Sequence, residues 1–283
     1  MTAEHATLEA RPRLAALEWK LLGDLLETRF GLAFDDNRRD ILCSRLLPRL
    51  EELHLDSFME YYHFLRCHPA RESEFVEIAK LATNGESYFF RESHHYDILT
   101  RHVAPVCEEN GRPLRILSAG CSSGQEAYTA AITLHNLKTV RHALEFEIEG
   151  CDINPLRIEW ARTASYTDRA LWNCDDLTRR ACFEQDGSRW RLRPSYREHV
   201  SFFEANLATE TGENWAPYDV VFCRNVLIYF SSRAFESAIR LFHRCLAPGG
   251  YLFLGHSESL INRSLGFEPI CLDSKIVYRR EDP

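Results

Sequence analysis

The stretch LRILSAGCSSGQEAY, residues 114–128, decides the fold of this chain. An aliphatic run ends at Ser118, small residues follow as far as Gly124, and apolar residues return at helical spacing beyond Glu126. This order predicts a strand, a tight turn and a helix, the unit that doubly wound α/β sheets repeat. Ligands bind at such turns because glycine lets them approach the backbone closely, although glycines in turns also serve purely structural ends. The spacing of Gly120 and Gly124 argues against the fingerprint of a nicotinamide dehydrogenase.

The composition indicates a globular protein that does not bind nucleic acid. The chain has 283 residues, 45% of them hydrophobic, and a formal net charge of −8. A nucleic-acid partner requires clustered lysine and arginine, so this acidic balance argues against one. The ten cysteines form no Cys-x-x-Cys pair and no zinc-type grouping, which predicts free thiols and no metal site. No apolar run is long enough to span a membrane and no signal peptide is recognisable, so we expect a cytoplasmic protein without membrane insertion.

Residues 14–83 are expected to form an α-helical N-terminal domain. Apolar residues recur at helical spacing over 14–30, and three further helical patterns follow with no strand between them. Gly31 is expected to end the first helix, and Asp35 and Asp36 to cap the second. The second pattern carries four arginines, which suit either a solvated helix face or a docking face for an acidic partner. These are Arg38, Arg39, Arg45 and Arg49.

A polar and aromatic segment, NGESYFFRESHHY over residues 84–96, comes next. Its three adjacent aromatic side chains cannot all face one core, so we expect another part of the chain to cover one of them. Arg91 among these rings would hold a fixed geometry, suited either to a carboxylate ligand or to a structural salt bridge at a domain junction. His94 and His95 lack metal-like neighbours, and we expect them to be polar helix residues.

The strand that follows is predicted to place a carboxylate at the ligand edge of the sheet. Residues 144–152 alternate polar and apolar side chains and end in Asp152. An acidic residue there can bind ribose hydroxyls or cap the next helix. Because Asn154 followed by Pro155 already suits the cap, ribose binding is favoured for Asp152.

The rest of the chain is expected to interrupt and then complete the sheet. Residues 165–200 are polar and mixed, with a turn at 186–188 between strand-like stretches that include 199–203, and they predict a small antiparallel insertion. Another strand should end before Asn206, and a buried run follows it from Asp219. Arg224 and Asn225 interrupt that run at the expected ligand crevice, and a hairpin is expected at the C-terminal end.

Four segments together resemble the CheR family of chemotaxis protein methyltransferases. They are NGESYFFRE (84–92), SAGCSSGQE (118–126), CRNVLIYF (223–230) and GHSES (255–259). The likeness covers nearly the whole chain in the same order. It implies a Rossmann-like class I methyltransferase sheet with a small antiparallel β insertion, within a domain of residues 84–283. It also implies methyl transfer from S-adenosylmethionine to glutamate side chains of chemoreceptors, which yields glutamyl methyl esters and S-adenosylhomocysteine.

The resemblance assigns roles to individual residues. Arg91 and Tyr229 match the pair proposed to act near the transferred methyl. The cofactor-binding candidates are Asn84, Gly85, Ser87, Arg91, Gly120, Glu126, Asp152, Asn206, Leu207, Arg224 and Asn225. Many members have asparagine where this chain has Gly85, so one cofactor contact is either lost or supplied by Asn84. The implied partner is the cytoplasmic helical region of chemoreceptors or a related signalling protein, although the second helix is less basic than is typical. The sequence indicates no oligomeric state.

Two other functions remain open at this point. The acceptor could be another protein or a small molecule, or the chain could be a regulator that binds S-adenosylmethionine without transferring methyl. A different residue in place of Arg91 or Tyr229 would indicate a non-catalytic regulator, but both residues are present. Methylation of DNA bases is disfavoured because Val-Leu-Ile follows Asn225, where such enzymes place a proline–aromatic pair to hold a flipped base.

Overall fold

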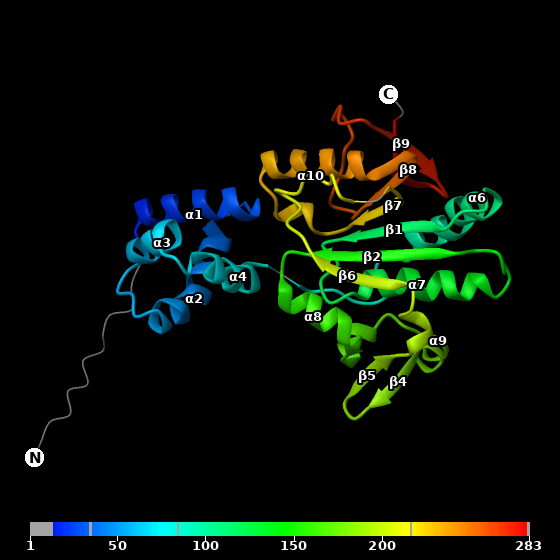
Figure 1. Ribbon diagram of the computed structural model, residues 1–283, viewed down its shortest axis with the longest axis horizontal. Coiled ribbons are helices and arrows are strands. Elements are labelled where there is room, and N and C mark those ends of the chain that lie inside the picture. Colours follow the sequence, from blue (N-terminus) through cyan, green and yellow to red (C-terminus); the bar gives the residue numbers. More distant parts are fainter. Residues whose placement is uncertain (1–13, 34–35, 84, 216, 282–283) are drawn as a thin grey trace, which may run out of the picture. The chain divides into compact units, whose positions relative to one another are not determined.

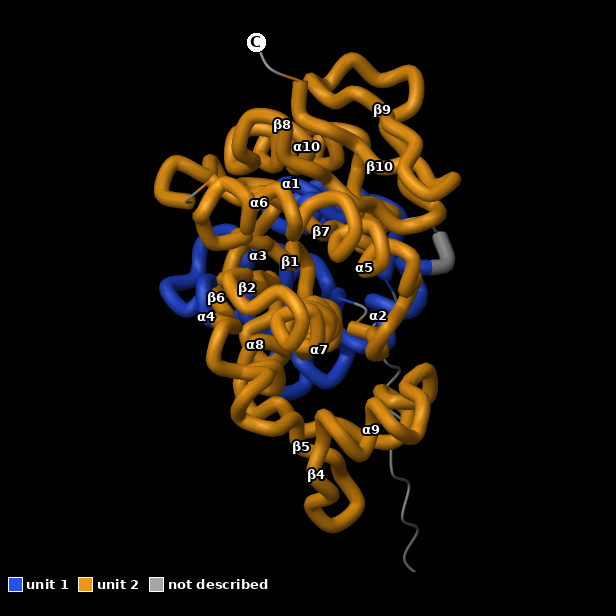
Figure 2. Tube along the Cα trace, turned by 90° about the vertical axis from the view of Figure 1, so that its right-hand side faces the viewer, with its two compact units in different colours: residues 1–83 blue, residues 84–283 orange. Residues whose placement is uncertain are grey.

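The computed structural model describes residues 14–33, 36–83, 85–215 and 217–281. The chain divides into two compact units, residues 1–83 and residues 84–283, which Figure 2 shows in separate colours. Each unit buries its own set of apolar side chains.

The long secondary-structure elements of the first unit are all helices in the part that the structure describes, as the sequence predicts. Its helices are α1 (Ala16–Phe30), α2 (Asp36–Glu52), α3 (Phe58–Cys67) and α4 (Arg71–Ala82). Gly31 ends α1 with a φ of +73°, a left-handed conformation that glycine adopts without strain. The cap predicted at Asp35 and the side chain of Asp36 lie outside the described residues.

The four arginines of α2 bond within the helical unit. Arg38, Arg39 and Arg45 donate to the backbone oxygens of Ala33, Leu14 and Leu81 at 2.9, 3.0 and 2.6 Å. Arg49 donates through Nε and Nη2 to the carboxylate of Glu74 at 3.0 and 2.6 Å. These bonds favour a structural role for this set of charges.

The second unit is organised around a seven-stranded sheet in the order β6-β2-β1-β7-β8-β10-β9. The parallel strands are β6 (Val200–Glu204), β2 (Phe146–Asp152), β1 (Leu114–Ala119), β7 (Tyr218–Cys223) and β8 (Leu246–Leu254). The strands β9 (Phe267–Leu272) and β10 (Lys275–Arg280) form the expected C-terminal hairpin, and β10 also pairs antiparallel to β8. Every residue of β7 is buried, as expected for a central parallel strand.

Helices cover both faces of this sheet, and strand side chains alternate between two cores (Figure 1). Ile116 of β1 belongs to the core that includes α7 (Gln125–Lys138) and α8 (Pro155–Thr163), whereas the adjacent Leu117 belongs to the core that includes α10 (Ser232–Cys245). The helical elements of this unit, other than those of the insertion, are α5 (His94–Ile98), η1 (Leu99–Val103), α6 (Ala104–Glu109), α7 (Gln125–Lys138), α8 (Pro155–Thr163), η4 (Leu227–Tyr229) and α10 (Ser232–Cys245).

The predicted insertion is a separate three-stranded antiparallel sheet in the order β3-β5-β4. It contains β3 (Ser165–Tyr166), η2 (Asp168–Leu171), α9 (Asp176–Cys182), β4 (Phe183–Asp186), β5 (Arg189–Leu192) and η3 (Pro194–Tyr196). The expectation that residues 199–203 belong to this sheet is wrong. They lie largely in β6, which pairs parallel to β2 over Ile148–Asp152 and forms one edge of the main sheet.

All ten cysteines are free, and seven are buried. Within the described ranges, no helix is both long and apolar enough to cross a membrane.

Glu74 offers a direct test of how the helical unit is held together. Its carboxylate is 3% exposed and also accepts the hydroxyl hydrogen of Tyr61 at 2.7 Å. The substitution Glu74→Ala leaves Arg49 without its buried partner, so we expect a loss of about 3 kcal/mol in the free energy of unfolding. Denaturant unfolding of the full chain measures this loss. The control is Glu72→Ala, whose ion pair with Arg29 is exposed and should contribute less than about 1 kcal/mol. Equal losses in both variants would contradict the structural role of Glu74.

Candidate functional site

The carboxyl ends of β1, β2, β6 and β7 meet at one edge of the sheet and bring together most of the predicted site. The register pairs Ala119 of β1 with Cys151 of β2, and Ser118 with Phe222 of β7. The turn 120–124 therefore lies next to Asp152 and to the loop that begins at Arg224. This edge is where open α/β sheets bind ligands. Asn84 lies outside the described residues.

Asp152 is anchored but keeps capacity to bind a ligand. Its Oδ2 accepts the backbone N–H of Ser122 and its Oδ1 that of Asn154, both at 2.9 Å. Asn154 caps α8, since its side chain accepts from the backbone of Leu156 and Arg157. Burial raises the pKa of Asp152, and backbone N–H groups, chiefly those of Asn154 and Ser122, together with the charge of Arg157 oppose that shift. Each carboxylate oxygen retains a second lone pair, which a ribose hydroxyl can use.

Gly120 joins the turn to the loop after β7. Its φ is +75°, and a Cβ placed on it would lie 2.5 Å from Cγ2 of Val226. A side chain at this position would therefore force the side chain of Val226, in the loop that carries Asn225 and Tyr229, to shift. The glycine signal seen in the sequence reflects this close approach as well as the tight turn.

Arg224 forms the centre of a buried polar network. Its Nε donates to Oε2 of Glu126 at 2.6 Å, Nη1 to the backbone oxygen of Arg91 at 2.5 Å, and Nη2 to the Tyr96 hydroxyl at 2.7 Å. The other oxygen of Glu126 accepts the hydroxyl hydrogen of Ser118 at 2.7 Å. Arg224 and Glu126, two of the predicted cofactor residues, thus bond to protein groups that build the site. Their direct contact with a cofactor stays a prediction.

Residues 85–92 lie across this edge, and aromatic side chains of the insertion pack against them. The ring of Tyr88 lies 5.0 Å from that of Trp172, and the ring of Phe89 lies 4.8 Å from that of Tyr166. The insertion therefore covers these adjacent aromatic side chains, as the sequence predicts for at least one of them. The guanidinium of Arg91 lies over the Tyr88 ring, 5.5 Å from its centroid.

Glu258 organises the loop after β7, a role that sequence reasoning missed. Its Oε1 accepts the backbone N–H groups of Val226, Leu227 and Ile228 at 2.9, 2.7 and 3.3 Å. Its Oε2 accepts those of Asn225 and Gly255, both at 2.8 Å. The segment GHSES served only to support the family resemblance, and nothing within it indicates these five bonds. One carboxylate thus holds the first turn that leads to Tyr229.

His95 differs from its expected role as a polar helix residue. Its side chain is buried, and Nδ1 lies 3.4 Å from Nη1 of Arg224. Burial, followed by the charge of Arg224, lowers the pKa of His95 to about 2, so the ring is neutral at physiological pH. The neighbouring Glu92 bonds to His256 Nδ1 at 2.8 Å.

The remaining candidates occupy the same edge with varied burial. Leu207 is buried and Oδ1 of Asn206 accepts the backbone N–H of Ala208 at 3.1 Å. Tyr229 is half-buried in η4. The Oδ1 atom of Asn225 is buried without a hydrogen-bond partner. Such an acceptor suits a ligand with a hydrogen-bond donor, so the residues present fit a nucleoside cofactor.

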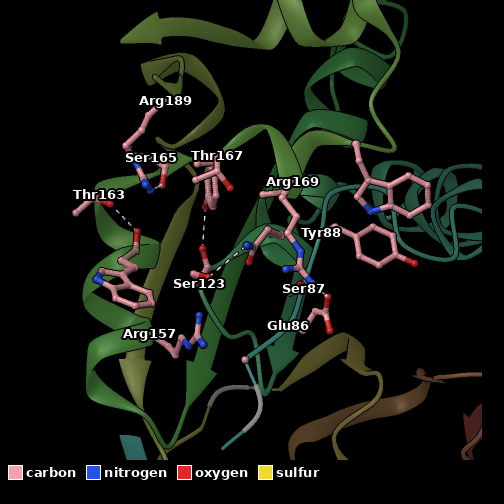
Figure 3. A pocket seen from close by; sticks show the side chains of 16 residues that line it. Glu86, Ser87, Tyr88, Ser123, Arg157, Thr163, Ser165, Thr167, Arg169 and Arg189 are labelled. Carbon is pink, nitrogen blue, oxygen red and sulfur yellow. Dashed lines mark hydrogen bonds and ion pairs between the residues drawn. The ribbon is translucent and has the colours of Figure 1, made fainter. Parts of the chain in front are cut away.

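A cavity of about 690 Å³ lies beside this edge, between α8, the insertion and residues 85–88 (Figure 3). Of the predicted cofactor residues that the structure describes, Gly85 and Ser87 line it. Arginine side chains from three elements reach it: Arg157 from α8, Arg169 from η2 and Arg189 from β5. No group of three metal-ligating side chains occurs in the part of the chain that the structure describes.

Comparisons with known proteins agree with this geometry. Residues 85–276 match the family described as CheR methyltransferase, SAM binding domain, and residues 17–79 match CheR methyltransferase, all-alpha domain. Chemotaxis protein methyltransferase 1 of Vibrio cholerae is 31% identical over 258 residues, 90% of this chain and 93% of that protein. Chemotaxis protein methyltransferase 1 of Pseudomonas aeruginosa is 30% identical, over 94% of this chain and 98% of that protein.

A solved structure of magnesium protoporphyrin IX methyltransferase from Synechocystis, with bound SAM, is 16% identical with a TM-score of 0.36. That match covers 75% of this chain and 93% of the other. The family matches confirm the predicted fold class and the predicted cofactor, S-adenosylmethionine.

The loop after β7 should lose its support when Glu258 is replaced. In Glu258→Gln an amide –NH2 group faces backbone N–H donors in place of an accepting oxygen. We expect the free energy of unfolding to fall by about 3 kcal/mol, because bonds to a charged acceptor are lost in a buried place. Denaturant unfolding measures the loss, and hydrogen exchange should show faster exchange of the amides of residues 225–228. The control is Glu268→Gln, whose ion pair with Arg279 is exposed. Unchanged exchange of these amides would contradict the role of Glu258.

Glu92 should make stability depend on pH. Burial acts to raise the pKa of Glu92, but the bond from His256 and the charge of Arg224 outweigh it and hold the pKa below the ordinary 4.5. A carboxylate with a lowered pKa stabilises the fold above pH 4.5 and loses this contribution as pH falls through its folded value. The stability difference between wild type and Glu92→Gln should therefore be about 1 kcal/mol near neutrality and shrink in acid. Denaturant unfolding at a series of pH values tests this. A difference that grows as pH falls would refute it.

Proposed function

Because the chain belongs to the CheR methyltransferase family, we propose that it transfers a methyl group from S-adenosylmethionine to glutamate side chains of chemoreceptors. The products are glutamyl methyl esters and S-adenosylhomocysteine. The family match over residues 85–276 and relatives about 30% identical over most of the chain support the reaction class. The observation in the structure that carries the proposal is the unpartnered Oδ1 of Asn225, at the same edge of the sheet as the anchored carboxylate of Asp152 and the turn that Gly120 allows.

In this proposal the protein accelerates the reaction mainly by aligning the two reactants and not by acid–base catalysis. An exposed glutamate has an ordinary pKa of about 4.3 and is already ionised at neutral pH, so no general base is required. When bound, S-adenosylmethionine would supply an electrophilic methyl group for transfer to the acceptor carboxylate. Asp152 and Asn225 would hold the nucleoside and Arg91 would orient a carboxylate. The hydroxyl of Tyr229 would lie beside the reacting centre. Alignment of this kind supplies roughly 7–11 kcal/mol in favourable intramolecular cases.

We also propose that residues 14–83 and 84–283 act as separate domains of a cytoplasmic enzyme, the second carrying the chemistry. The partner is the cytoplasmic helical region of a chemoreceptor. Since the arginines of α2 bond within their own unit, acceptor recognition should depend on other groups as well.

Binding and chemistry can be tested separately. Calorimetric titration with S-adenosylhomocysteine should show binding by the wild-type protein and a loss of at least about tenfold in Asp152→Ala, because a buried carboxylate that accepts from ribose is removed. Failure of the wild-type protein to bind would refute the cofactor site.

Methyl transfer should then produce an ester on a receptor glutamate. With radiolabelled S-adenosylmethionine and a receptor fragment, the label should be released as volatile methanol by mild alkali, which amide and amine products resist. Receptor fragments with glutamine at the acceptor positions are the matched control. Arg91→Ala and Tyr229→Phe should lower the rate by about 10²-fold if alignment is lost. Full activity in either variant would remove that residue from the proposed mechanism, and a label stable to alkali would exclude glutamyl esters.

A further inference from the structure

The space beside Gly85 is occupied by a side chain from another element. Its φ is not in the left-handed region, so the backbone conformation does not require glycine. A Cβ at this position would instead overlap the guanidinium atoms Cζ, Nε and Nη2 of Arg157. The guanidinium of Arg157, on α8, therefore fills the space that a side chain at position 85 would occupy.

Arg157 lies close to the predicted ribose end of the site. The backbone oxygen of Gly85 accepts the hydroxyl hydrogen of Ser122 at 2.9 Å, and the backbone N–H of Ser122 donates to Asp152 at 2.9 Å. Ser122 therefore bridges the backbone of Gly85 and the carboxylate of Asp152. The guanidinium of Arg157, which packs on Gly85, lies near this bridge. Burial lowers the pKa of Arg157, and the charge of Asp152 opposes that shift.

The guanidinium is held in place without an acidic partner of its own. It lies over the ring of Trp160, 4.9 Å from the centroid, and within the described residues no ion pair joins it to a carboxylate. Figure 3 shows the side chain of Arg157 at the wall of the 690 Å³ cavity. By contrast, Arg169 in the same wall forms an exposed ion pair with Glu86. Arg157 thus keeps donors available at a site where Asp152 offers only acceptors.

We propose that Arg157 is a cofactor-positioning residue of this chain, paired with Gly85 and acting with Asp152 on the ribose diol. A ribose hydroxyl both donates and accepts hydrogen bonds. Asp152 can accept its hydrogen, and the guanidinium can donate to its oxygen. The pair Gly85–Arg157 thereby supplies the contact that the departure at position 85 would otherwise remove. This inference rests on the proposed function, since it concerns the same cofactor.

Calorimetric titration with S-adenosylhomocysteine tests the proposal directly. Arg157→Met keeps a long unbranched side chain at this position but removes the donors, and we expect the dissociation constant to rise about tenfold. Arg169→Met, which removes a guanidinium from the same cavity wall, is the matched control and should change the constant less than about twofold. Thermal unfolding of both variants verifies that they are folded.

The diol itself can be tested with altered ligands. The 2′-deoxy and 3′-deoxy analogues of S-adenosylhomocysteine should bind the wild type more weakly than the parent ligand. If Arg157 donates to one of these oxygens, the loss for that analogue should shrink in Arg157→Met, because the partner is already absent. Equal losses in wild type and variant for both analogues would overturn the assignment to ribose.

The pairing of the two positions predicts a non-additive effect. Gly85→Asn should weaken binding, since its side chain must displace the guanidinium of Arg157, and the same substitution should cost less affinity when it is added to Arg157→Met than when it is added to the wild type. Additive losses would refute the pairing. If the wild type does not bind S-adenosylhomocysteine, the proposed function fails. If it binds and Arg157→Met binds equally well, this inference alone fails.

Discussion

One buried cation, the guanidinium of Arg224, holds the ligand edge of the sheet together. A charge in this interior is unfavourable unless it is paired and fully hydrogen-bonded. Burial acts to lower the pKa of Arg224, but Tyr96 and Glu126 raise it above its ordinary value, so the group stays charged. Its bonds to Glu126, Tyr96 and the backbone oxygen of Arg91 link α7, α5 and the segment 85–92. Loss of any of these partners would leave the buried charge incompletely hydrogen-bonded, which is unfavourable. The network therefore holds the three segments in their positions.

Four non-glycine residues at the same edge have left-handed backbone conformations. Phe90, Glu92, Ser122 and Asn225 all have positive φ, between +51° and +62°, although none is glycine. Such conformations persist only where surrounding contacts over-determine them. The backbone of Phe90 is held on both sides, since its N–H donates to the hydroxyl of Thr129 and its oxygen accepts from the side chain of Asn173. Strain of this kind is consistent with an edge that is organised before a ligand binds.

The sequence predicts what depends on local patterns and misses what depends on distant contacts. The strand, turn and helix around Gly120, the cap at Asn154 and the antiparallel insertion follow from periodicity and turn chemistry, and the structure contains all three. Glu258 acts on residues about thirty positions earlier in the chain, so nothing in its neighbourhood reveals its role. The sequence predicts the same role for His95 as for His94, yet their positions on α5 bury one ring far more than the other. Helical spacing alone did not identify which of the two faces Arg224.

The distribution of hydrogen bonds separates residues that build the site from those able to act in it. Both oxygens of Glu126 and both of Glu258 accept bonds from the protein, so these carboxylates are poorly suited to serve as general acids or bases. Asp152 keeps free lone pairs and Asn225 keeps an unpartnered oxygen. A transfer to an already ionised carboxylate needs no proton exchange, only fixed acceptors and donors that hold two reactants in line. This edge meets that requirement. Structural hydrogen bonds occupy Glu126 and Glu258, whereas Asp152 and Asn225 keep oriented acceptor atoms for a ligand.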